Sequence, residues 1–259
     1  MHLFIMWGFL GLFLGTVLLS IDHYLVHFLY GVVYLYYSVI LEIFGLLLLL
    51  GLIWALIRRY VQRLPRLENR KEDLGLLIWL LVVIISGFYV EALRLAFQQP
   101  AWTLWSFAGL GLSFLCPSTM NIPATYPYFW WFHALLSLGL IAIIPYSKLF
   151  HMMAAPVNIY FKDHPENGID EACDSQNVEY SVKNLINFDA CTRCGRCVEV
   201  CPAASVGEPL SPRDFILDTR EHLFRKYKPF FRLPLFREQT NNNNLDDEVE
   251  GLWHCTTCN

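Results

Sequence analysis

The sequence predicts an all-α membrane helical bundle of about four transmembrane helices, followed by a small, cysteine-rich α-helical domain. Of the 259 residues, 55% are hydrophobic and only 16% are charged, whereas soluble domains carry about 25% charged residues. Long, nearly uncharged runs fill the first part of the chain. Four cysteines then stand at the spacing C-x2-C-x2-C-x3-C-P between Cys191 and Pro202. Ferredoxin loops use this spacing to wrap a [4Fe–4S] cluster, so the second domain is expected to be ferredoxin-like.

Composition and charge exclude several other classes. The net charge of −4 averages two unlike halves and gives no basic surface for nucleic acid. The N-terminus is apolar from Leu3, without a basic region or a small-residue cleavage site, which indicates a retained membrane helix and not a signal peptide. Six of the eight cysteines fall in two closely spaced groups that are built on C-x-x-C patterns. This usage favours metal binding in a reducing compartment over disulfides.

The first two spans are predicted from uncharged runs long enough to cross a bilayer. Residues 3–20 form the first span, and residues 38–57 form the second. The aromatic stretch 21–37 between them suits an interfacial loop or short helix. The second span is followed at once by a basic cluster, so the positive-inside rule places this connection in the cytoplasm. The cluster consists of Arg58, Arg59, Arg63, Arg66, Arg70 and Lys71.

Residues 74–97 form the predicted third span, and residues 130–146 form the last one. The stretch 101–115 is apolar but short. If the cysteine domain is cytoplasmic, the last span must run from outside to inside. Residues 101–128 are therefore expected to stay at the outer face as an interfacial or re-entrant segment, with both termini inside. A fifth crossing is the alternative.

Four histidines are candidate axial ligands of b-type haem. His133 and His151 are eighteen residues apart, which is five helical turns or ~27 Å on one helix face, provided Pro145 kinks the helix without breaking it. His2 and His23 have a similar relation across the first span. We therefore pair His2 with His151 inside and His23 with His133 outside. His27 competes with His23, and span-end histidines that bind nothing are the alternative.

Charged residues inside spans are costly and therefore candidates for function. Glu91 and Arg94 stand i,i+3 near the outer end of the third span, at about the depth of His133. They suit a quinone site, which needs a hydrogen-bond donor and a proton acceptor, or else a helix-end ion pair. Glu42 has the same two interpretations.

The second half begins with a polar linker, residues 154–187, after the membrane domain of residues 1–153. Residues 188–259 form the iron–sulfur domain, with cluster ligands Cys191, Cys194, Cys197 and Cys201. Arg193 and Arg196 flank these thiols, where they raise the reduction potential or are simply solvated. Ser211-Pro212 predicts the start of a helix over residues 213–227.

Cys255 and Cys258 open a second C-x2-C motif just before the chain stops. In two-cluster ferredoxins the fourth cysteine of each motif ligates the other cluster. Cys201 is therefore expected to serve the second cluster, and the missing ligands are expected beyond Asn259. On this interpretation the sequence is a fragment, cut at the C-terminus and at the N-terminus too. Zinc at Cys255 and Cys258 is the alternative.

Three segments resemble a known family: HLFIMWGFLGLFLGT, RRYVQRLPRLENRKED and WWFHALLSLGLIAIIPYSKLFHMMAAPVNIY. They are similar to the gamma subunit, a cytochrome b, of respiratory nitrate reductase, and more closely to its fusion with a heterodisulfide-reductase-type [4Fe–4S] oxidoreductase. The resemblance implies haem ligation by His2, His133 and His151. Two departures stand out: no span precedes the His2 helix, and Leu12 stands where the nitrate reductase subunit has its second early histidine.

The resemblance implies membrane-bound electron transfer in the cytoplasmic membrane of a bacterium or archaeon, with the iron–sulfur domain on the cytoplasmic side. Electrons are expected to pass from a soluble donor, such as electron-transferring flavoprotein, through one or two [4Fe–4S] clusters and one or two b haems to menaquinone. The expected partners are therefore the bilayer, the quinone and the soluble protein. A quinol-oxidising heterodisulfide reductase-like subunit running in the opposite direction, or a non-catalytic membrane anchor, is the alternative.

Overall fold

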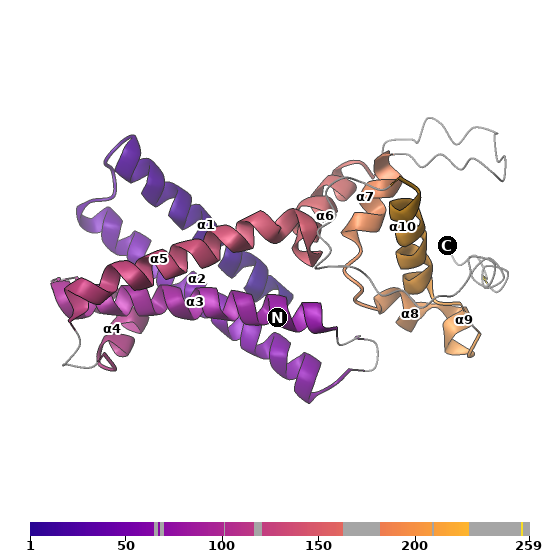
Figure 1. Cartoon of the computed structure of the whole chain (residues 1–259), viewed down its shortest axis with the longest axis horizontal. Helices are drawn as coiled ribbons and strands as arrows, with labels where there is room; N and C mark the ends of the chain where they lie inside the picture. The colour runs from indigo at the N-terminus through magenta and orange to yellow at the C-terminus, as the bar shows by residue number, and fades with distance from the viewer. Residues whose placement is uncertain are drawn as a thin grey trace. The chain divides into compact units, whose positions relative to one another are not determined.

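The computed structural model describes residues 1–64, 67, 70–100, 102–116, 121–162, 182–208, 210–227 and 255. The described residues form two compact units, one of residues 1–64 and 70–142 and the other of residue 67 and the residues from 143 onward. All regular elements in the described part of the chain are helices, as Figure 1 shows. The prediction of an all-α protein is therefore confirmed.

Four long helices build the first unit. They are α1 (His2–Tyr24), α2 (Gly31–Leu56), α3 (Lys71–Gln98) and α5 (Ile122–Ile143), and a π-helical turn (Ile57–Val61) extends α2. Within the described residues, four helices are long and apolar enough to cross a membrane. The prediction of four spans is confirmed, and each helix begins earlier than the apolar run alone indicated.

Glycines on α1 set its packing against α2. A Cβ atom at Gly8, Gly11 or Gly15 would lie 2.7, 2.4 and 2.3 Å from side-chain atoms of Leu48, Phe44 and Leu41. Such contacts are too close for any real Cβ, so the two backbones approach as small residues allow in membrane bundles. As the residue number rises along α1, the number of the contacting residue on α2 falls, so the two helices run antiparallel.

Similar contacts fix the register of α2, α3 and α5. A Cβ at Gly45 would lie 2.7 Å from the Phe88 ring, and one at Gly87 would lie 3.1 Å from the His133 ring. The Trp79 indole N–H donates to the carbonyl of Leu136 over 3.1 Å. Together with the Gly11–Phe44 contact, these neighbours bring Gly11 to the level of His133 in the bundle, to within about one helical turn.

Residues 102–116 do not cross the membrane. They contain a 3₁₀ turn (Thr103–Trp105) and α4 (Phe107–Ser113), a helix of 7 residues. Such a helix is ~10 Å long, against a hydrocarbon core of ~30 Å. Helix α4 packs against α3 and α2. A short re-entrant or interfacial segment is therefore observed in place of a fifth crossing.

The helix that carries His133 does not continue to His151. Helix α5 ends at Ile143, and a 3₁₀ turn (Ile144–Tyr146) contains Pro145. Ser147 is extended, with φ −123° and ψ 174°, before a second 3₁₀ turn (Lys148–Phe150). The expectation that Pro145 only kinks the helix is wrong, because the proline lacks an N–H donor and the extended Ser147 completes the break. The five-turn relation between the two histidines does not hold.

The second unit contains α6 (His151–Tyr160), α7 (Val182–Ala190), α8 (Arg196–Val200), α9 (Pro202–Ser205) and α10 (Pro212–Tyr227). Helices α6 and α7 pack together, and they overlap both ends of the segment predicted as a linker. The Ser211 hydroxyl accepts the backbone N–H of Asp214 over 3.3 Å. This N-cap confirms the predicted start of α10.

Candidate functional site

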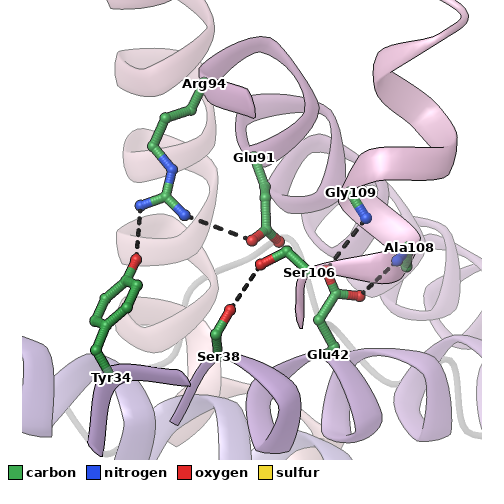
Figure 2. Close-up of polar contacts among 8 residues, drawn as sticks. All are labelled: Tyr34, Ser38, Glu42, Glu91, Arg94, Ser106, Ala108 and Gly109. Carbon is green, nitrogen blue, oxygen red and sulfur yellow. Dashed lines mark hydrogen bonds and ion pairs between the residues drawn. The ribbon is translucent and has the colours of Figure 1, made fainter. Parts of the chain in front are cut away.

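A polar cluster joins α2, α3 and α4 inside the membrane unit (Figure 2). Glu42 is at its centre, with only 2% of its surface exposed. Its carboxyl oxygens accept the backbone N–H groups of Ala108 and Gly109 over 3.1 and 3.2 Å. Both amides belong to the first turn of α4, where N–H groups have no partner within the helix. Glu42 therefore acts as the N-terminal cap of a helix 66 residues further along the chain.

The residue at the N-cap position of α4, Ser106, does not cap the helix with its own side chain. Ser106 precedes the helix, but its hydroxyl is bonded to that of Ser38 at 2.6 Å, and both residues are buried. A Cβ at Gly109 would lie 2.8 Å from the Glu91 side chain, so glycine lets α4 come this close. The sequence left Glu42 as an ion pair or a functional residue and contained no signal for this cap.

The predicted pair of Glu91 and Arg94 is brought together. Arg94 Nη2 lies 3.5 Å from Glu91 Oε1, and Nη1 donates to the Tyr34 hydroxyl over 3.3 Å. The guanidinium also lies 5.3 Å from the centre of the Trp102 ring, a cation–π distance. Its Nε is buried and has no hydrogen-bond acceptor among the described residues.

Glu91 and Glu42 both approach Gly109, whose N–H donates to Glu42 and where an added Cβ would lie 2.8 Å from the Glu91 side chain. The cluster therefore combines a cation, two neighbouring acids, and a donor without an acceptor among the described residues. Such groups can bind a carbonyl oxygen by hydrogen bonds and can donate a proton to it.

A cavity of about 330 Å³ opens beside the cluster. That volume falls at the small end of ligand pockets, roughly 300–1,000 Å³. Each of the four spans contributes one helical face, and the polar residues are few: Thr16, Glu42, Glu91, His133 and Ser137. A more open groove of about 600 Å³ lies at the Tyr34 and Trp102 side chains that contact Arg94.

His133 is held in one orientation at this cavity. Its Nδ1 lies 2.9 Å from the Ser86 hydroxyl oxygen, and that hydroxyl donates to the carbonyl of Val83 over 2.9 Å. Because the Ser86 proton is used in this way, its oxygen accepts from Nδ1–H, and Nε2 keeps a lone pair. Metal-binding histidines are oriented by such a partner on their other nitrogen. The residues around His133 therefore fit an axial ligand of haem iron.

His23 is not brought to His133. It lies twelve residues beyond Gly11 on α1, which is ~18 Å further along the helix axis than the level of His133. Its exposed ring packs on Tyr24, with centroids 4.8 Å apart. Nearby, Asp22 accepts the N–H groups of Phe28 and Leu29 over 2.7 and 2.6 Å, closing the turn between α1 and α2.

His2 and His151 belong to different units, so their pairing stays a prediction. His2 is the first residue of α1. His151 begins α6, and its Nδ1 bonds to the carbonyl of Lys148. Helix α6 packs against α7, and α7 leads directly into the cysteine loop.

The loop from Cys191 to Cys201 turns through two left-handed residues, Arg193 with φ 58° and Gly195 with φ 69°. Cys194 and Cys197 are exposed, whereas Cys201 is buried. Partial desolvation raises the pKa of the Cys197 thiol, and the neighbouring Cys191 and Cys194 thiols raise it further. Three thiols therefore share one neighbourhood, although no metal-holding group of three His, Cys, Asp or Glu residues is formed among the described residues.

An ion pair anchors this loop at its N-terminal side. Asp189, near the end of α7, lies 3.1 Å from the guanidinium of Arg220 on α10. Burial raises the pKa of Asp189, while the charge of Arg220 opposes that shift. Of the second motif, Cys255 is exposed, and Cys258 lies outside the described residues. The donor set of the first motif fits an iron–sulfur cluster by its chemistry and spacing.

Replacing Glu42 with Ala is expected to loosen α4 from the bundle. Each buried amide left without its acceptor costs about 1–3 kcal/mol, so the thermal midpoint in detergent should fall and the Ala108 and Gly109 amides should exchange faster. Glu42→Gln keeps one carbonyl oxygen for one of the two amides and should therefore lose less stability than Glu42→Ala. Equal losses in both variants would show that the cap is not the role of Glu42.

Comparison with known proteins gives two domain matches. A family model for the nitrate reductase gamma subunit matches residues 2–166, and one for a 4Fe-4S dicluster domain matches residues 183–259. No solved structure matches the chain.

Two curated relatives align with most or all of the chain, and a third aligns with less than half of it. The EtfAB:quinone oxidoreductase of Syntrophomonas wolfei is 32% identical over 309 aligned positions, covering 100% of this chain and 42% of the relative. The probable iron-sulfur-binding oxidoreductase FadF of Bacillus subtilis is 26% identical, covering 88% and 38%. A component of the dihydromethanophenazine:CoB–CoM heterodisulfide reductase of Methanosarcina barkeri is 35% identical over 116 positions, covering 44% and 37%. The chain thus spans about two fifths of the length of these relatives.

Proposed function

Because the chain belongs to the nitrate reductase gamma subunit family and continues as a 4Fe-4S dicluster domain, we propose that it transfers electrons between a soluble protein and a membrane quinone. The observation that carries the proposal is the polar cluster of Glu42, Glu91 and Arg94 beside the cavity that His133 lines. One span bundle thereby offers both a haem ligand and a site able to exchange protons with a quinone.

The electron carriers are expected at two places in the chain. Cys191, Cys194 and Cys197 would hold one [4Fe–4S] cluster, while Cys201, Cys255 and Cys258 would serve the second. His133 would ligate the outer b haem, and His2 with His151 the inner one. These groups, when bound, supply one-electron transfer. The packing of α6 on α7 supports a short route from the cysteine loop to His151.

The quinone is expected at the outer end of the third span. The Arg94 guanidinium, a cation in contact with two residues of the open groove, suits a quinone carbonyl oxygen. The carboxyl groups of Glu42 and Glu91 are the candidates for delivering protons to the quinone, which takes up two protons when two electrons reduce it to the quinol. Tyr34 and Trp102 hold Arg94 in position and line the groove through which an isoprenoid quinone would approach.

We place the iron–sulfur domain in the cytoplasm. Six basic residues between α2 and α3 favour that side for the connection, and four spans return the chain to the side from which it began. The name of the Syntrophomonas relative supports electron-transferring flavoprotein as the donor and quinone as the acceptor. The similarity to the heterodisulfide reductase component favours the reverse direction as the second candidate.

The proposal is tested with the purified membrane protein in detergent. Dithionite should produce the α-band of reduced b-type haem together with an iron–sulfur EPR signal, and a soluble menaquinone analogue should then reoxidise both. If the purified protein contains neither haem nor cluster, the proposal fails and the alternative of a non-catalytic membrane anchor is supported. Reoxidation by a disulfide instead of by the quinone analogue would support the reverse direction.

A further inference from the structure

We propose that His133 is the sole protein ligand offered to an iron porphyrin at the cavity, so that an iron bound there would keep one coordination position without a protein ligand. This inference rests on the haem binding of the proposed function and goes beyond it. It replaces the pair of imidazoles expected at this level by one imidazole and one apolar wall. The open position would take a small neutral molecule such as carbon monoxide.

The first step is the register of the helices. The Gly11–Phe44, Gly45–Phe88 and Gly87–His133 contacts connect α1 to α5 through α2 and α3 at one level. The residue of α1 next to this level on the cavity face is Leu12. An axial ligand opposite His133 would have to come from this part of α1. Among the described residues that line the cavity, His133 is the one imidazole.

The second step is the chemistry of the wall opposite His133. The α1 residues in the cavity are Phe9, Leu12, Phe13 and Thr16, which form one helical face. Three of them have no donor atom for iron. The Thr16 hydroxyl donates to the carbonyl of Leu12 over 3.0 Å. A neutral hydroxyl used in this way is a poor iron ligand.

The third step excludes the other polar residues of the cavity as ligands of the iron. The Glu42 carboxyl accepts two amides of α4, and the Glu91 carboxyl is paired with Arg94. Ser137 lies one turn after His133 on the same helix, so it shares the His133 wall. His23 is ~18 Å away along α1. No second ligand remains for the iron among the described residues of this cavity.

The test compares the iron of the purified protein with that of a Leu12→His variant. The unaltered protein should show high-spin haem by resonance Raman spectroscopy and should bind carbon monoxide when reduced. In Leu12→His this high-spin fraction should become low-spin, and its carbon monoxide binding should be lost. Leu10→His is the matched control, because Leu10 is 45% exposed and lies outside the cavity; it should keep the high-spin signal.

Two further variants keep the inference falsifiable if Leu12→His does not fold. His133→Ala should remove the high-spin haem, whereas His23→Ala should leave it unchanged. If the unaltered protein holds only low-spin haem and His23→Ala creates a high-spin fraction, His23 is the second ligand and the inference is overturned while the proposed function stands. If no haem is bound at all, the proposed function fails with it.

Discussion

Replacing Cys194 with Ala is expected to remove the cluster of the first cysteine motif and to stop electron transfer. Cys194 is exposed, so the substitution costs little packing energy. Loss of a residue that only orients a metal ligand typically lowers metal affinity or activity by about 10–100-fold. Cys194 is expected to be a direct ligand, so its loss should lower the rate of electron transfer from the donor to the haem by more than about 100-fold. Iron and sulfide content, the EPR spectrum and the rate of haem reduction by a soluble donor measure the effect.

Cys116 provides the matched control. It lies just after α4, and burial raises the pKa of its thiol, so it is a poor ligand and a poor nucleophile. Cys116→Ala should keep the iron content and the rate of haem reduction. If Cys194→Ala keeps its full iron and sulfide content, Cys194 is not a ligand, and the cluster assignment of the loop has to be revised.

Replacing Glu91 with Gln is expected to slow quinone reduction by roughly 10²–10⁴-fold, the usual contribution of a positioned acid or base. Glutamine keeps the length of the side chain and its hydrogen bonds, but it cannot release a proton. Haem content and haem reduction by dithionite should stay unchanged, because the electron carriers are not altered. Stopped-flow reoxidation of reduced haem by a menaquinone analogue measures the quinone step alone.

Glu72→Gln is the control for Glu91→Gln, since Glu72 lies in the first turn of the same helix, far from Arg94. It should leave the rate of reoxidation unchanged. The helix-end ion pair makes a different prediction for Glu91→Gln: a lower unfolding temperature with normal quinone turnover. That result would assign Glu91 and Arg94 to stability and would leave the quinone site without a proton donor.

The spans could be predicted from composition because a bilayer requires each backbone polar group to find its partner within the segment. An uncharged run of sufficient length therefore has to be a helix, whatever surrounds it. The cysteine motif and the N-cap at Ser211 are equally local, since their ligands and partners lie within a few residues. The same holds for the i,i+3 pair of Glu91 and Arg94.

Contacts between distant segments were decided only by the tertiary structure. Glu42 caps a helix 66 residues away because Ser106, the local candidate, is bonded to Ser38. Leu12 and His133 line one cavity because the close contacts at Gly11, Gly45 and Gly87 fix how far each helix slides along its neighbour. The sequence thus determined which segments are helices and which residues carry chemistry, whereas helix packing at these glycines decided which of those residues meet.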